Sequence, residues 1–88
     1  MIRATIRLYE TQGQWKIREL GVSDGLGTSQ HVWRPFGTYA SEEEAITLAR
    51  YEARVRIAET WDFAAFDYIN WDIKTIVNPH ELEYPSFL

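Results

Sequence analysis

Residues 2–9 read Ile2-Arg3-Ala4-Thr5-Ile6-Arg7-Leu8-Tyr9. Aliphatic residues alternate in this stretch with charged, polar or aromatic residues. A period of two places alternate side chains on opposite faces of a β-strand. One face of residues 2–9 must therefore be covered, while Arg3 and Arg7 share the other face. The pattern predicts a sheet that is buried on one side.

A hairpin and a third strand extend this sheet in the sequence. Residues 11–14 have the composition of a tight turn, in which Gly13 takes a positive φ. Residues 15–22 follow as a second strand whose alternation places Lys16 and Arg18 on one face. A third strand is predicted over residues 31–39. Pro35 places this strand at a sheet edge or bends it there, because proline has no N–H. Residues 1–40 are thus predicted to form an antiparallel meander.

A helix is predicted directly after the meander. Ser41 is a suitable N-cap, and Glu44 three residues later completes the pattern of a capping box. An apolar stripe at helical spacing follows, formed by Ile46, Ala49, Ala53 and Ile57. Leu48 is a further candidate for the core. The helix is expected over residues 41–68, because the spacing continues beyond Thr60 to Tyr68.

The last third of the chain alternates again. Residues 69–77 are predicted as a fourth strand, which Asn78-Pro79 ends, and residues 80–88 form an apolar tail. The whole chain, residues 1–88, is then a single α+β domain with the order β-β-β-α-β. It has a three- to four-stranded antiparallel sheet and one long helix packed on one face.

Composition narrows the class of protein. The 88 residues include no Cys, which excludes disulfides and thiolate metal sites and favours a cytoplasmic location. No apolar run is long enough for a membrane span or a signal peptide. The net charge of −4 divides into +2 over residues 1–40 and −6 over residues 41–88. That balance disfavours a protein that binds nucleic acid by charge alone.

No group of residues reaches the standard of a catalytic or metal site. His31 and His80 are far apart and lack neighbours at ligand spacing, so we expect no metal and no cofactor. Three aspartates, Asp62, Asp67 and Asp72, recur among aromatic residues. Their spacing of five does not align them on one helical face, so we interpret them as a solvated rim. We therefore expect a protein that is not an enzyme.

The first candidate surface is aromatic. Four Trp, five Tyr and four Phe are more than a core of this size needs, and aromatic residues are enriched in interface hot spots. The candidate protein-binding residues are Trp61, Phe63, Phe66, Trp71, Tyr84 and Phe87. Completion of the core explains them equally well. If they form an interface, the partner is another protein or a second copy in a homodimer.

The second candidate surface is cationic. Arg3, Arg7, Lys16 and Arg18 would lie together if the hairpin places them on the outer face of the sheet, and Arg34 would join them. Such a face can bind nucleic acid or an acidic partner. Alternatively, these cations only solvate an ordinary sheet and pair with Glu10 and Glu19.

The junction of sheet and helix, residues 36–45, reads Phe-Gly-Thr-Tyr-Ala-Ser-Glu-Glu-Glu-Ala. With this junction, the segment of about residues 1–60 resembles two kinds of protein. One is the three-stranded-sheet-plus-helix DNA-binding module of ethylene-response factors and phage-integrase arm-type domains. That resemblance implies DNA contacts by Arg3, Arg7, Lys16, Arg18 and Arg34. The other is the ribonuclease-H-like antitoxin of toxin–antitoxin pairs, whose Pro- and Gly-containing strand motif is absent here. Residues 61–88 match neither.

The leading functional hypothesis is a small non-enzymatic binding or adaptor protein that acts through protein–protein contacts. The alternative is a nucleic-acid-binding module that uses the basic outer face of the sheet. Both hypotheses place the function on a surface of the sheet or of the C-terminal third.

Overall fold

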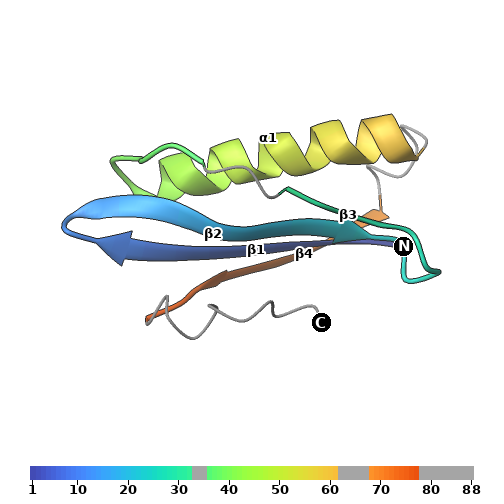
Figure 1. Ribbon diagram of the computed structural model, residues 1–88, viewed down its shortest axis with the longest axis horizontal. Coiled ribbons are helices and arrows are strands. Elements are labelled where there is room, and N and C mark those ends of the chain that lie inside the picture. Colours follow the sequence, from blue (N-terminus) through green and yellow to red (C-terminus); the bar gives the residue numbers. More distant parts are fainter. Residues whose placement is uncertain (33–35, 62–67, 78–88) are drawn as a thin grey trace.

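A computed structural model describes residues 1–32, 36–61 and 68–77 of the chain. The described residues form one sheet of four strands with one helix on one of its faces (Figure 1). The elements in chain order are β1 (Ile2–Thr11), β2 (Gln14–Ser23), β3 (Ser29–His31), α1 (Glu42–Thr60) and β4 (Ile69–Thr75). The predicted α+β fold and its β-β-β-α-β order are confirmed.

The sheet has the strand order β3-β2-β1-β4. The first three strands form the predicted antiparallel meander, but β4 pairs parallel to β1, with Ile2 opposite Ile69 and Leu8 opposite Thr75. The fully antiparallel sheet was therefore wrong in this one pair. The reason is the helix, whose 19 residues extend about 28 Å. It carries the chain from the hairpin end of the sheet back to the end where β1 begins.

The hairpin between β1 and β2 has the predicted turn and an unpredicted bulge. Gln12 and Gly13 both have positive φ, at 53° and 77°, as a type I′ turn requires. The register then shifts, because Leu8 lies opposite Ile17 whereas Arg7 lies opposite Glu19. Arg18 is the extra residue of this β-bulge. After the bulge, Leu20 faces the helix and Glu19 faces outward. Unbroken alternation from Ile17 would place Glu19 on the helix side and Leu20 on the outer face.

The predicted third strand is much shorter in the structure. β3 covers Ser29–His31, and Val32 continues it by donating its N–H to the carbonyl of Leu20 at 3.0 Å. Tyr39, at the far end of the predicted strand, forms an isolated bridge with Trp15 through two backbone hydrogen bonds of 2.8 and 2.9 Å. Pro35 lies outside the described residues. β3 does occupy a sheet edge, as expected.

The helix begins as predicted. The Ser41 hydroxyl accepts the N–H of Glu44 at 3.1 Å, and the Glu44 carboxylate accepts the N–H of Ala40 at 3.3 Å. The buried face consists of Ala45, Ala49, Ala53 and Ile57, each 0% exposed. Ala45 therefore occupies the core position that the spacing predicts for Ile46. Ile46 is half-buried, and Leu48 is 38% exposed rather than in the core.

The helix ends earlier than expected. Its last residue is Thr60, and Trp61 caps it in an extended conformation. Residues 62–67, over which the spacing predicts that it continues, lie outside the described residues. The indole Nε1 of Trp61 donates to the Asp24 carboxylate at 3.2 Å. This bond joins the end of α1 to the loop between β2 and β3. The helix end is thus held over the edge of the sheet that β3 forms.

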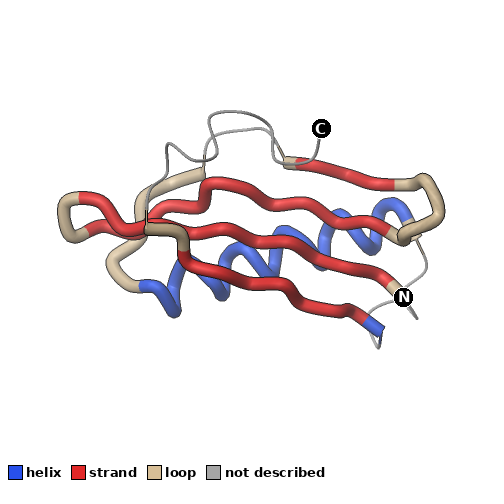
Figure 2. The backbone as a smooth tube through the Cα atoms, turned by 90° about the horizontal axis from the view of Figure 1, so that it is seen from below, coloured by secondary structure: helices blue, strands red, loops and turns tan. Residues whose placement is uncertain are grey.

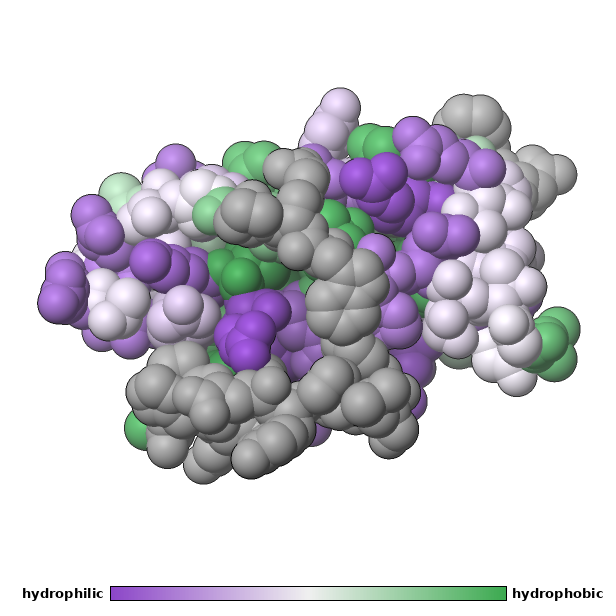
Figure 3. Space-filling view, in the orientation of Figure 1, coloured by the Kyte–Doolittle hydropathy of each residue, from purple (hydrophilic) through white to green (hydrophobic). Residues whose placement is uncertain are grey.

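The core lies between α1 and the middle strands. Figure 2 views the sheet from the face opposite α1 and shows α1 running obliquely behind it. The core side chains of the sheet come from β1 and β2: Ile2, Ala4, Ile6, Leu8, Ile17, Leu20 and Val22. On the β3 side of the molecule, hydrophobic residues show between the helix and the sheet (Figure 3). The edge strand β4 contributes only half-buried residues.

Candidate functional site

The first candidate site is the outer edge of β4. The N–H of Ile76 bonds to the carbonyl of Leu8 at 2.7 Å, which fixes the direction of the ladder between β1 and β4. In a parallel pair, alternate residues turn both backbone groups toward the partner. The backbone groups of the remaining residues, Ile69, Trp71, Ile73 and Thr75, therefore point away from β1. Among the described strands none lies beyond them, and we call this side of β4 the open edge.

Apolar side chains adjoin the open edge on the helix side. Ile69, Trp71 and Ile73 lie opposite Ile2, Ala4 and Ile6 of β1, and all three are half-buried. Because α1 crosses the sheet obliquely, helix side chains rather than the helix backbone cover Trp71. The guanidinium carbons of Arg50 and Arg54 lie 4.8 and 5.4 Å from the centroid of its ring.

The stack of Arg50 and Arg54 on Trp71 contains one buried polar atom that lacks a hydrogen bond to any described residue. The Nε of Arg50 is buried and has no hydrogen-bond partner in the part of the chain that the structure describes. A buried N–H without an acceptor costs about 1–3 kcal/mol, so an acceptor brought by a partner would be favourable. Tryptophan and arginine are also the residues most enriched in interface hot spots. The open edge and its Arg–Trp stack can thus bind an extended polypeptide.

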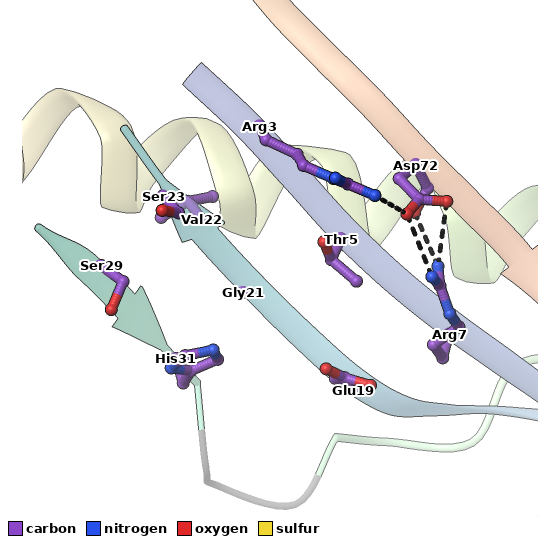
Figure 4. Close-up of a pocket in the computed structure, with 10 residues that line it drawn as sticks. All are labelled: Arg3, Thr5, Arg7, Glu19, Gly21, Val22, Ser23, Ser29, His31 and Asp72. Atoms are coloured by element: carbon purple, nitrogen blue, oxygen red, sulfur yellow. Dashed lines mark hydrogen bonds and ion pairs between the residues drawn. The ribbon is translucent and has the colours of Figure 1, made fainter. Parts of the chain in front are cut away.

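The second candidate site is on the outer face of the sheet, opposite the helix. Residues of neighbouring strands form rows across it, with His31, Gly21, Thr5 and Asp72 in the central row. The small residues Gly21 and Thr5 leave a hollow of about 450 Å³ between larger neighbours (Figure 4). Its walls are Arg3, Arg7 and Asp72 on one side and Ser23, Ser29, Glu19 and His31 on the other.

Asp72 holds both arginines of β1. It accepts from Arg3 at 2.7 Å and from Arg7 at 3.0 Å, and its backbone carbonyl also accepts from Arg7 at 2.9 Å. The side chains of Asp72 and Arg7 are 15% and 17% exposed, whereas that of Arg3 is 61% exposed. The hydrogen bonds from Arg7, then from Arg3, lower the pKa of Asp72 from 3.8 to about 2.

The opposite wall depends on close contact between two strands. A Cβ added to Gly21 would lie 2.6 Å from the imidazole of His31, so the ring lies directly over this glycine. The hollow therefore offers hydroxyl, imidazole, guanidinium and carboxylate groups in one place. Among the described residues, no group of three or more His, Cys, Asp or Glu could hold a metal ion.

The structure separates the predicted site residues into two faces. Of the aromatic set, Trp71 lies on the helix side of β4 and Trp61 caps α1, whereas Phe63, Phe66, Tyr84 and Phe87 lie outside the described residues. Of the cationic set, Arg3, Arg7 and Lys16 share the outer face. Arg18 is in the bulge, and Arg34 lies outside the described residues.

Sequence reasoning missed three residues that the structure makes prominent. Asp72 is not on a solvated rim but is held between two arginines, and Asp62 and Asp67 lie outside the described residues. Arg50 and Arg54 stack on Trp71. Their spacing of four places them on one helix face, which is a usable signal. It becomes informative only when β4 is known to lie beneath that face.

Comparisons with known proteins do not assign the chain to a family. Among the residues that the structure describes, no helix has both the length and the apolarity for crossing a membrane. The resemblance of residues 36–45 to DNA-binding modules and antitoxins stays a prediction. No family model, no curated protein and no solved structure matches the chain.

Proposed function

We propose that the protein is a small non-enzymatic binding module that joins a partner protein through the open edge of β4. The observation that carries the proposal is the edge itself, where Ile69, Trp71, Ile73 and Thr75 turn outward backbone groups that no described strand pairs with. An exposed edge is a template for strand addition. Main-chain hydrogen bonds then supply affinity, and alternate side chains supply specificity.

The helix side of the edge supports the same function. A strand added beside β4 would place alternate side chains next to Trp71 and within reach of Arg50 and Arg54. Apolar groups would cover the half-buried indole, and an acidic or carbonyl acceptor would satisfy the buried Nε of Arg50. The stack therefore favours an extended partner with both apolar and acceptor groups on one face.

The proposal predicts that Thr75→Pro abolishes partner binding, whereas Thr75→Ala preserves it. The N–H of Thr75 points outward, so proline removes a donor from the open edge without removing one from the β1–β4 ladder. Alanine removes the exposed side chain, including its 3.4 Å bond to Glu42, and keeps the N–H. The measurement is quantitative mass spectrometry of proteins that each immobilised variant retains from an extract of its host.

The supporting result is a defined protein, including the chain itself, that wild type and Thr75→Ala retain and Thr75→Pro loses. Thermal melts verify that all three variants are folded. If every retained protein binds the three variants equally, the open edge is not the binding surface and the proposal is wrong.

The alternative function is nucleic-acid binding by the outer face. Among the described strand residues, this face carries Arg3, Arg7, Lys16 and Lys74 against the carboxylates of Glu19 and Asp72, so the described part of the face is positive although the chain is acidic. Arg3 is the most informative position because its side chain is 61% exposed. If this face binds nucleic acid, Arg3→Ala weakens the binding and flattens its dependence on salt. The absence of retention on single- or double-stranded DNA or RNA at low salt would remove the alternative.

A further inference from the structure

We infer that the strand bound at the open edge is β4 of a second copy of this chain, paired antiparallel about a two-fold axis at Ile73. The inference rests on the proposed function and names its partner. Two copies would then share one continuous sheet of eight strands, twice the four described here. The two open edges would pair with each other, as in an isologous dimer.

Backbone geometry restricts the registers that such a pair can adopt. Only Ile69, Trp71, Ile73 and Thr75 direct N–H and C=O groups outward, so hydrogen-bonded pairs must join these residues to one another. The two-fold axis can therefore pass through Trp71, Asp72, Ile73 or Lys74 near the middle of the strand. Each choice places different side chains opposite each other.

Charge decides among these registers. An axis at Asp72 places two aspartates directly opposite each other, and an axis at Lys74 does the same with two lysines. An axis at Trp71 leaves Lys74 opposite Tyr68. Only the axis at Ile73 pairs Asp72 with Lys74 of the second copy, and it does so twice. These are non-hydrogen-bonded pairs, in which the side chains are closest, and opposite charges there are stabilising.

The same register matches apolar residues on the helix side. Ile73 lies opposite its own copy, Trp71 opposite Thr75, and Ile69 opposite Val77. Val77 is 96% exposed in the single chain and would gain cover from Ile69. Ile69, Trp71 and Ile73 of both copies would then form one apolar strip beside the Arg50 and Arg54 side chains. The edge is thus complementary to itself in charge, hydrogen bonding and apolarity.

A cysteine scan tests the register directly, because the chain has no Cys of its own. In the proposed dimer the two Cα atoms of residue 73 are about 5.5 Å apart, within the range of a disulfide. We expect Ile73→Cys to form a covalent dimer on mild oxidation. The two copies of residue 75 are offset by four residues, about 13 Å, so the matched variant Thr75→Cys should not cross-link.

Light scattering on the untreated protein measures the dimer itself. We expect twice the chain mass for wild type and a dissociation constant raised about tenfold or more by Lys74→Glu, which faces Asp72 of the second copy. Lys16→Glu is the control, because it changes the net charge equally on the same face but lies away from β4.

The outcomes separate the inference from the proposed function. A monomeric wild type that still binds another protein in a Thr75→Pro-sensitive manner overturns the second copy and leaves the open edge as the binding surface. A monomer without such a partner overturns both. A dimer in which Thr75→Cys cross-links as readily as Ile73→Cys overturns the register.

Discussion

Replacing Ile57 by alanine is expected to lower the free energy of unfolding by about 2–5 kcal/mol. Ile57 is 0% exposed and belongs to the core cluster between helix and sheet. Its neighbours along the buried face of α1 are alanines, so Ile57 is the only large side chain that this face buries fully. A cavity left there cannot be filled by a neighbouring large side chain of the helix.

Leu48→Ala is the matched control on the same helix. Leu48 is 38% exposed, so its truncation removes less buried surface and leaves no closed cavity. We expect a loss below about 1 kcal/mol, in line with area-proportional burial of a partly exposed side chain. Urea unfolding of both variants measures the two losses. Equal losses would mean that α1 presents a different face to the sheet.

The parts of the fold that the sequence predicts are those that depend on local chemistry. Alternation over residues 2–9 identifies β1, because period two has no other regular explanation. Gly13 marks the turn through its positive φ, and Ser41 with Glu44 marks the start of α1. Each of these signals lies within a few residues of the feature that it determines.

The parts that the sequence does not predict depend on contacts between distant segments. The bulge at Arg18 reverses the faces of β2, and nothing in the residues next to it announces the extra residue. The preference for Ala45 over Leu48 in the core follows from close packing of α1 on the sheet, which requires small residues. The parallel direction of β4 follows from where the helix ends.

The candidate site shows the same division. Alternation correctly places Arg3 and Arg7 on one face, but their partner Asp72 is more than 60 positions away in the sequence. Trp71 was identified as a surplus aromatic residue, and the structure shows it half-buried beneath Arg50 and Arg54. Trp71 is thus neither fully in the core nor freely exposed. The sequence indicates that Trp71 is important, but it does not predict that Arg50 and Arg54 lie against it.

Removal of the Asp72 carboxylate should produce a loss of stability that depends on pH. We expect Asp72→Asn to lower the free energy of unfolding by about 1–3 kcal/mol at neutral pH, because Arg7 is left half-buried without its charged partner. The contribution of Arg3 to this loss is small, since its side chain is 61% exposed and screened by water.

The direction of the pH dependence follows from the pKa of Asp72. Folding lowers this pKa from 3.8 to about 2, chiefly through the hydrogen bonds from Arg7 and Arg3. A carboxyl whose pKa is lower in the folded state stabilises the fold fully above its unfolded value and loses that contribution as pH falls. The stability difference between wild type and Asp72→Asn should therefore be constant above about pH 5, shrink between pH 4 and 2, and be smallest near pH 2.

Urea unfolding of wild type and Asp72→Asn at a series of pH values measures this difference. Glu10→Gln, at an exposed position of β1, controls for the loss of one negative charge. A gap between wild type and Asp72→Asn that stays unchanged from pH 7 to pH 2 would contradict the ion pair, because an uncharged role of the side chain does not titrate. A gap that closes only in the acid range shows that the Arg3–Asp72–Arg7 cluster holds β4 to β1 in addition to their backbone ladder, and hence supports the open edge.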